Sequence, residues 1–278
     1  MFKNIKQFIH HLSHNRSYWV LLYILSKLFR VRTFTERLLK IKAERKFFEK
    51  VKHTTTIIRG PFKGMIYPRL ESSYSEMAPK IIGSYEAELF DALEDIFNKN
   101  YKQIIDIGCA EGYYAVGLAL KIPSSTVFAY DINPKALRMC EEMSRLNNVS
   151  ARVFVREQCT NETLNNFNFT KKSLIMSDCE GYELELFSEK NIDNLVTCDL
   201  LIELHDILGL SVKEKIIQVF KNTHNVQLIS SAPRDPDLYF ELNDFGDKEK
   251  RIILSECRDG LFGDKPMEWA YITSKKQP

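Results

Sequence analysis

Residues 104–120 have the sequence IIDIGCAEGYYAVGLAL, and residues 127–133 have the sequence VFAYDIN. The first stretch predicts a buried strand, a turn that carries Gly108 and Gly112, and the start of a helix. The second predicts another strand that ends in an acid, Asp131. A glycine turn between strand and helix, followed by a second strand closed by a carboxylate, is typical of a site for an adenosine-containing cofactor.

The spacing of the glycines separates two kinds of cofactor. A dinucleotide fingerprint is G-x-G-x-x-G, which lets a pyrophosphate sit on the helix N-terminus. Here the pattern is D-x-G-x-x-x-G, and Glu111 within the turn would repel a pyrophosphate. S-adenosylmethionine has no phosphate, and its ammonium and sulfonium are positive, so Asp106 and nearby acids suit it. The sequence therefore predicts S-adenosylmethionine as the cofactor of a methyltransferase core.

Strands and helices alternate from residue 104 onward. This alternation predicts a doubly wound, seven-stranded, mainly parallel sheet, the Rossmann-like fold of class I methyltransferases, in an α/β chain with a helical N-terminal extension. The predicted strands are 103–107, 126–130, 151–155, 173–178, 198–204, 226–231 and 269–273, of which the last two form an antiparallel hairpin. The predicted helices between them are 112–121, 134–146, 182–188 and 212–222.

Two domains are expected, a basic α-helical extension over residues 1–53 and the methyltransferase domain over residues 54–278. The first 50 residues lack glycine and proline, whereas the segment from Thr54, TTTIIRGPFKGMIYP, predicts a β-hairpin. Ser84, followed by acids, predicts the N-cap of a helix that begins there. The hairpin and the polar segment 232–265 are expected to line the acceptor pocket.

The net charge of +2 conceals an asymmetry along the chain. Residues 1–60 hold 14 Lys or Arg against 3 Asp or Glu, net +11, whereas the remaining 218 residues hold 25 against 34, net −9. A basic helical head can attract anionic lipid, nucleic acid or an acidic partner, or it can be a solvated helix face. The expected roles of residues 1–50 are peripheral membrane contact, packing on their own domain, or formation of a homodimer.

Six cysteines show neither C-x-x-C pairs nor the spacings of a disulfide framework, so we expect reduced thiols and a cytoplasmic protein. Cys109 and Cys179 lie in the two best motifs but have no neighbouring base in sequence, and covalent catalysis is not expected. The apolar run YWVLLYIL (18–25) is shorter than the about 20 residues that span a bilayer. Any membrane contact is therefore expected to be peripheral, at the inner face.

Ligands of an open α/β sheet bind at the carboxyl ends of its strands, so the residues that close each strand are the candidate site. The first strand supplies Asp106 near its carboxyl end. Asp131 closes the second, where a carboxylate can accept both ribose hydroxyls; its alternative role is to cap the following helix. After the third strand, Glu157, Gln158 or Cys159 could reach the adenine.

The fourth and fifth strands end in residues that suit the reaction itself. Asp178 is expected to face the sulfonium and the acceptor. Glu180 and Glu183 follow at a spacing that places them on one helix face, where first-turn acids favour the helix dipole. Glu203 and His205 lie on the same side of the fifth strand because its period is two. A histidine at a strand end beside an acid is a candidate base, although a lone histidine is more often structural.

At this point the motifs resemble those of a known family. GSYEAEL (83–89), DIGCAEGYYAV (106–116), DCEGYELELF (178–187) and LLIELHD (200–206) together resemble the FkbM-like family of S-adenosylmethionine-dependent methyltransferases, from about residue 60 to 273. The resemblance implies O-methylation of a sugar or polyketide hydroxyl, and Tyr85 and Glu86 covering the cofactor. The chain departs from the family at Asp131, commonly glutamate, and at Cys109 and Cys179.

The predicted site combines both lines of reasoning. The predicted cofactor-binding residues are Tyr85, Glu86, Asp106, Gly108, Cys109, Ala110, Gly112, Asp131, Ile132, Gln158, Asp178 and Glu180. The predicted catalytic residues are Asp178, Glu203 and His205.

The predicted reaction moves a methyl group from S-adenosylmethionine to a hydroxyl oxygen of a small molecule or glycan, of the sugar or natural-product type. An alcohol is a poor nucleophile at neutral pH, so a base or a metal is expected. In one hypothesis His205 or Asp178 accepts the hydroxyl proton and Glu203 orients the histidine. In the other, Asp178 and Glu203 hold Mg²⁺, which lowers the pKa of the hydroxyl; no other metal ligand is assigned.

Two other functions were weighed. Methylation of a nucleobase amine is disfavoured because DCEG (178–181) lacks the Asn/Asp-Pro-Pro-aromatic element that grips an amino group, so nucleic acid is not an expected partner. The alternative from a different class is a non-catalytic protein with a methyltransferase fold, which uses its basic N-terminal helices on a membrane or partner.

Overall fold

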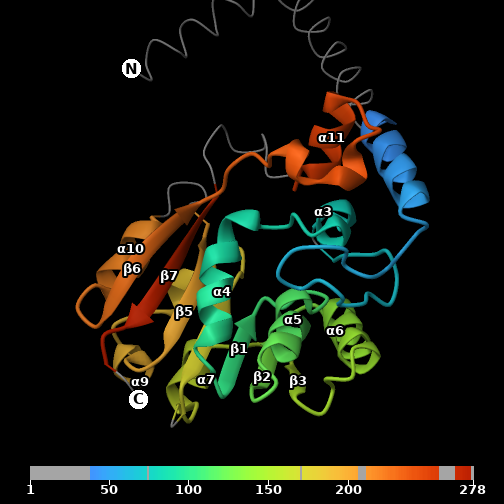
Figure 1. The fold of residues 1–278 in the computed structure, drawn as a ribbon. Helices are drawn as coiled ribbons and strands as arrows, with labels where there is room; N and C mark the ends of the chain where they lie inside the picture. Colours follow the sequence, from blue (N-terminus) through green and yellow to red (C-terminus); the bar gives the residue numbers. More distant parts are fainter. Residues whose placement is uncertain (1–37, 74, 170, 206–210, 257–266, 277–278) are drawn as a thin grey trace, which may run out of the picture.

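The computed structural model describes residues 38–73, 75–169, 171–205, 211–256 and 267–276 (Figure 1). Seven strands form one sheet in the order β3-β2-β1-β4-β5-β7-β6. Strands β1 to β5 are parallel, and β7 runs antiparallel between β5 and β6. The strands are β1 Gln103–Ile107, β2 Thr126–Tyr130, β3 Val153–Arg156, β4 Ser173–Ser177, β5 Asp199–Leu204, β6 His224–Ser230 and β7 Glu268–Ser274. The predicted doubly wound sheet and its antiparallel terminal hairpin are confirmed.

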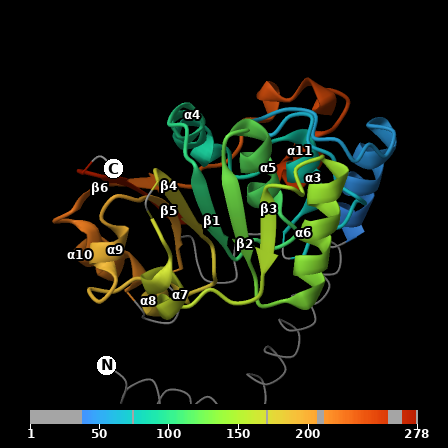
Figure 2. The same cartoon turned by 90° about the horizontal axis from the view of Figure 1, so that it is seen from below.

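Helices cover both faces of this sheet. In Figure 2, α4 and α5 lie on one face, and α7 to α10 lie on the other. The labelled α-helices are α3 Met77–Ile82, α4 Phe90–Asn98, α5 Tyr113–Lys121, α6 Pro134–Leu146, α7 Asn161–Asn166, α8 Glu183–Leu186, α9 Ile192–Leu195, α10 Val212–Phe220 and α11 Asp247–Leu254. Short 3₁₀ helices are η1 Ala87–Leu89, η2 Pro236–Leu238 and η3 Phe240–Leu242.

Two hydrophobic cores follow from this arrangement. Successive side chains of a strand point to opposite faces, so Ile104 packs in the core beneath α5 while Ile105 packs in the core beneath α10. Because both faces are covered, the central strands are almost continuously apolar. The polar residues that do occur near the strand ends are therefore exceptions that need an explanation.

The strand register sets the floor of the candidate site. Ile107 pairs with both Tyr130 and Ser177, so β1, β2 and β4 end at one level. Ser177 pairs with Ile202 of β5. Asp178, the residue after β4, therefore lies beside Glu203. The chain adds strands on one side of β1 as far as β3 and then returns to add β4 on the other side. Open α/β sheets bind ligands at such a switch point between β1 and β4.

The β-hairpin predicted from Thr54 is confirmed as a short antiparallel pairing. A bridge joins Thr56 and Ile66. The Ile57 N–H donates to the Met65 carbonyl (2.9 Å), and the Tyr67 N–H donates to the Thr55 carbonyl (2.8 Å). Two other N–H groups of the segment have tertiary partners: the Ile58 N–H donates to the Ile81 carbonyl (2.8 Å), and the Ile66 N–H donates to Asn147 Oδ1 (2.8 Å). The segment thus pairs with itself and also packs onto the sheet domain.

The helix predicted to begin at Ser84 begins later. Glu86 has a left-handed backbone conformation (φ 48°), which interrupts any helix at that point. A 3₁₀ turn follows at Ala87–Leu89, and α4 starts at Phe90. Ser84 is fully buried and caps no helix.

Residues 38–50 form a helix that packs on the domain beside α11 (Figure 1). Phe47 is fully buried in the larger core. Lys46 pairs with Glu249 (2.9 Å) and Lys50 with Asp244 (2.6 Å). Part of the predicted extension therefore packs on its own domain, and the rest, residues 1–37, lies outside the described residues. No helix within the described ranges is both long and apolar enough to cross a bilayer.

Candidate active site

The turn after β1 is tied to the end of β2. The N–H groups of Gly108 and Cys109 donate to the Tyr130 carbonyl (2.8 and 2.9 Å), and the Ala110 N–H donates to Asp131 Oδ2 (2.9 Å). Asp131 Oδ1 accepts from the Asn133 N–H (2.8 Å). The cap of α6 is Asn133, whose side chain accepts from the Lys135 N–H, so Asp131 does not cap that helix.

The two glycines of the turn are required by packing. A Cβ on Gly108 would lie 1.7 Å from the Asp178 carbonyl oxygen, and one on Gly112 would lie 2.8 Å from Cys140 Sγ. Both residues also have positive φ, 81° and 98°. The space beside each Cα is therefore occupied by protein, and neither glycine can carry a side chain. Gly108 thereby joins the cofactor turn to the end of β4.

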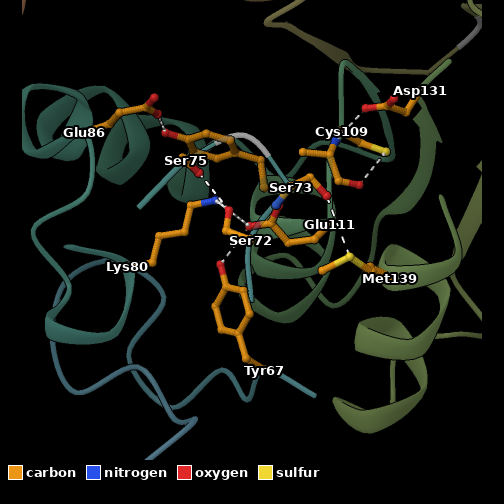
Figure 3. Close-up of polar contacts among 12 residues, drawn as sticks. Tyr67, Ser72, Ser73, Ser75, Lys80, Glu86, Cys109, Glu111, Asp131 and Met139 are labelled. Atoms are coloured by element: carbon orange, nitrogen blue, oxygen red, sulfur yellow. Dashed lines mark hydrogen bonds and ion pairs between the residues drawn. The ribbon is translucent and has the colours of Figure 1, made fainter. Parts of the chain in front are cut away.

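Glu111, within the same turn, points away from Asp131 into a buried polar cluster (Figure 3). Its carboxylate pairs with Lys80 Nζ (2.5 Å) and accepts from Ser72 Oγ (2.9 Å) and the Ser73 N–H (3.1 Å). The Tyr67 hydroxyl lies 3.4 Å away. Although burial disfavours its charge, Lys80 lowers the pKa of Glu111. The expected repulsion of a pyrophosphate by Glu111 is thus wrong, because Lys80 neutralises that charge.

Three carboxyls converge at the ends of β1, β2 and β4. Asp106 is 3% exposed, and its Oδ2 makes no hydrogen bond within the described residues. Burial, together with the charges of Asp178 and Asp131, raises the pKa of Asp106 to about 8. A buried carboxyl oxygen that accepts no hydrogen bond and lies among like charges is costly unless a cation is supplied. This region therefore suits a positively charged ligand.

The predicted catalytic residues meet at the ends of β4 and β5. His205 Nε2 lies 3.6 Å from Asp178 Oδ1 and 3.6 Å from Glu203 Oε2. Burial and the adjacent Glu203 raise the pKa of Asp178 well above its usual range. Each of the three residues offers a ligand atom within 4.8 Å of the other two. The structure therefore brings together all three predicted catalytic side chains.

Two further acids of the DCEGYE segment contact the same imidazole. Glu180 Oε2 lies 3.5 Å from His205 Nε2, and Glu183 Oε1 lies 3.4 Å from Nδ1. Glu183 is fully buried and also accepts from the Cys179 N–H (3.0 Å). Although burial opposes the charge on His205, its contact with Glu183 and the charge of Asp178 raise its pKa. The prediction that Glu180 and Glu183 share a helix face is wrong, because α8 begins at Glu183 and Glu180 precedes it with a left-handed backbone (φ 54°). Both carboxylates nevertheless contact His205.

Tyr85 and Glu86 lie on the wall between this site and the Lys80 cluster. Both are buried, and the Tyr114 hydroxyl donates to the Glu86 carboxylate. Lys80 Nζ lies 4.8 Å from the centre of the Tyr85 ring. The pKa of Asp178 is raised mainly by burial and by the charge and hydrogen bond of Glu203, and the charge of Glu86 adds a smaller effect in the same direction. Glu86 thus lies close enough to the β4 end to act on it electrostatically.

The remaining predicted contacts differ in exposure. Ile132 is 78% exposed directly after Asp131, and Gln158 is exposed while Cys159 is buried. Exposure leaves Ile132 and Gln158 accessible to an adenine, whereas Cys159 faces the core. A hydrogen bond with Cys140 and burial raise the pKa of Cys109, which fits the expectation that this thiol is not a nucleophile.

Two residues of the site were not in the predicted set. Glu183 was assigned to the helix dipole, yet its carboxylate contacts His205; its position three residues after Glu180 was the available signal. Lys80 lies in the apolar segment MAPKII, where a single buried lysine carries no pattern that identifies its partner. Both roles depend on contacts between distant segments.

The strand order and the glycine turn that precedes Asp131 define a class I methyltransferase fold. Residues 88–170 match the family model of the methyltransferase small domain. Release factor glutamine methyltransferase of Flavobacterium psychrophilum is 24% identical over 163 residues, which are 57% of this chain and 51% of that protein. The chain thus spans about half the length of the curated relative it matches.

Solved structures similar to this chain include an O-methyltransferase and an rRNA methylase. The O-methyltransferase TomG of Streptomyces achromogenes, solved with S-adenosylmethionine, has a TM-score of 0.45 and 10% identity over 74% of this chain and 83% of its own. An rRNA methylase of Streptococcus thermophilus has a TM-score of 0.47 and 14% identity over 69% of this chain and 99% of its own. The FkbM-like resemblance stays a prediction.

Proposed function

We propose that this chain transfers a methyl group from S-adenosylmethionine to a hydroxyl oxygen of a small molecule or glycan, of the sugar or natural-product type. The observation that supports this best is the meeting of Asp178, Glu203 and His205 beside the glycine turn. A proton must leave a hydroxyl when its oxygen is methylated, and these groups can hold or move one. The FkbM-like motifs described above support the same acceptor class.

The residues present fit the cofactor. Asp106, Asp131 and Asp178 form an acidic region that suits an ammonium and a sulfonium, and the partnerless Asp106 Oδ2 is available to a cation. Asp131 would hold the ribose hydroxyls, and the exposed Ile132 would cover the adenine. The bound cofactor supplies an electrophilic methyl group on a sulfonium, whose departing thioether is neutral.

Two versions of acceptor activation use the same residues. In the first, His205 Nε2 or Asp178 takes the hydroxyl proton while Glu203 orients the imidazole. In the second, Asp178 and Glu203 hold a divalent ion, Mg²⁺ in the simplest case, and the acceptor loses its proton more readily.

A nitrogen acceptor is the second candidate, because the matched relative is a glutamine methyltransferase. The residues after β4 weigh against it. DCEG provides two acids and no proline or aromatic ring at the first four positions, so the chain lacks the grip on a planar amide or amine that such acceptors require. A glutamine-containing peptide belongs in the acceptor screen for this reason.

Peripheral membrane contact and a homodimer through residues 1–50 are also part of the proposal. Residues 38–50 are the described part of this region. Their Lys46 and Lys50 pair with acids of the methyltransferase domain, which favours packing on that domain over membrane contact for this part. Those charges are partly neutralised. Membrane attraction would then depend on the basic residues that precede residue 38.

Calorimetric binding of S-adenosylmethionine to the wild-type chain and to Asp131→Ala tests the cofactor. We expect binding by the wild type and at least about tenfold weaker binding by the variant, a loss of about 1.4 kcal/mol. Asp193→Ala, at an exposed position in α9, is the matched control and should bind normally. No binding by a folded wild type would favour the non-catalytic scaffold instead.

Acceptor class is tested with methyl-labelled S-adenosylmethionine and a panel of sugar hydroxyls, polyketide hydroxyls and a glutamine peptide. Label in an O-methyl product supports the proposal. Label only in the peptide would establish the nitrogen acceptor.

A further inference from the structure

One imidazole at the carboxyl end of the sheet faces an excess of carboxylates. His205 is 6% exposed, and its Nε2 lies 3.5 to 3.6 Å from oxygens of Asp178, Glu180 and Glu203. Glu183 lies on the other side, at Nδ1. A protonated imidazole carries one positive charge, so it cannot balance this set by itself. The cluster is therefore built around negative charge that a cation would neutralise.

Two buried atoms in the cluster lack a hydrogen-bond partner among the described residues. They are His205 Nδ1 and Glu183 Oε2, and Glu183 is fully buried. The long Nδ1 to Oε1 contact of 3.4 Å shortens to a hydrogen bond if the ring shifts by a few tenths of an ångström. An ion bound to Nε2 and the Glu183 carboxylate accepting from Nδ1–H would together fix the orientation of the His205 ring.

We propose that Asp178, Glu203 and His205 bind one divalent first-row transition-metal ion, for which Mn²⁺ is the probe, and that Glu183 orients His205 for this role. The proposal deepens the proposed function, on which its catalytic meaning rests. Glu180, 78% exposed at the rim, is not required as a ligand.

The spacing of the donor atoms suits such an ion. The ligand atoms of Asp178, Glu203 and His205 all lie within 4.8 Å of one another. Ligands at about 2.1 Å from an ion are separated by about 3 Å when adjacent and about 4.2 Å when opposite. Small side-chain shifts would therefore complete a site that is open on the acceptor side.

The nitrogen donor of His205 favours a transition-metal ion over Mg²⁺. Mg²⁺ selects oxygen ligands in an octahedral shell and keeps several waters, whereas imidazole suits first-row transition ions. One imidazole with two carboxylates is a mixed set that Mn²⁺, Fe²⁺ and Co²⁺ share. His205 then serves as a ligand, and the ion rather than the imidazole promotes loss of the acceptor proton.

The test is the titration of Mn²⁺ into the chelator-treated full chain. Binding is monitored as the loss of the electron paramagnetic resonance signal of free Mn²⁺. We expect one ion per chain in the wild type. His205→Ala and Asp178→Asn should weaken binding at least about 100-fold, and Glu183→Gln by about 10- to 100-fold. Glu185→Gln, which removes an exposed acid from the same helix, should bind as the wild type does.

Three results would overturn the inference. They are no stoichiometric Mn²⁺ in the wild type, unchanged binding by folded His205→Ala and Asp178→Asn, or Mg²⁺ competing on equal terms with Mn²⁺, which would mean that the nitrogen is not a ligand. Calorimetry with S-adenosylmethionine on the same samples keeps the proposals apart. Cofactor binding without Mn²⁺ would overturn only the metal site, and Mn²⁺ without cofactor binding would overturn only the methyltransferase proposal.

Discussion

The carboxylates in and beside the glycine turn fall into two regions that differ in their partners, one around Glu111 and the other around Asp106 and Asp178. Glu111 is buried and matched by Lys80, two serine-derived donors and a tyrosine. Asp178 and Asp106 lie among other carboxylates, and Asp106 keeps an oxygen with no partner in the described structure. A buried charge that is fully paired supports the fold, whereas carboxylates held together in excess of their cationic partners indicate a ligand site. The difference separates structure from function within a few residues of sequence.

Gly108 connects the two regions, so its replacement should have the largest effect. The Cβ of Gly108→Ala would collide with the Asp178 carbonyl, and its φ of 81° is strained for alanine. We expect a loss of at least about 4 kcal/mol in the free energy of unfolding. Gly181→Ala, at φ 99° with open space around it, is the control and should cost only about 1–2 kcal/mol. Urea denaturation measures both; equal losses would mean that the close approach is not limiting.

Lys80→Met should break the paired region alone. Without the ammonium, Glu111 is left buried and uncompensated, which costs about 3–5 kcal/mol. The double variant Lys80→Met/Glu111→Gln should recover part of this loss, since no buried charge remains. Lys135→Met removes an exposed partner of Glu71 and should change the urea midpoint little. A loss in the double variant equal to the sum of the single ones would contradict coupling between the two residues.

The two regions should respond to pH with opposite signs. The pKa of Asp106 rises from 3.8 to about 8 on folding, so the folded chain binds more protons between these values and stability falls as pH rises. The slope is at most about 1.4 kcal/mol per pH unit. Glu111 has a lowered pKa, so its contribution is present above pH 4.5 and is lost as pH falls through its folded pKa.

Unfolding measured from pH 5 to 8 checks this for Asp106. Asp106→Asn should flatten the dependence relative to the wild type, whereas Glu185→Gln, at an exposed position, should leave the slope in that range unchanged. An unaltered slope in Asp106→Asn would show that another group is responsible.

Glu203→Gln should have the smallest effect, with a sign opposite to that of Lys80→Met. It removes a like charge beside Asp178, so in the presence of chelator we expect the free energy of unfolding to rise by about 1 kcal/mol. The same change should weaken Mn²⁺ binding. Destabilisation under chelator would indicate that the carboxylates of the β4 and β5 ends are already balanced by protein groups.

The sequence by itself predicted the alternation of strands and helices, the glycine turn, and the three residues that meet at the β4 and β5 ends. These depend on period, on turn chemistry and on the rule that strand ends share one edge, which are properties of neighbouring residues. It failed at Ser84, because the left-handed backbone of Glu86 interrupts the helix there.

Only the tertiary structure decided which acids are paired. Lys80 and Glu111 are 31 positions apart, and Glu183 reaches His205 from a different strand end. A local sequence pattern cannot predict partners that are so far apart along the chain, because the free energy of burying a charge depends on which side chains the folded sheet brings around it. The same physics explains why Gly108 is fixed by the Asp178 carbonyl, a contact that exists only after β1 and β4 have paired.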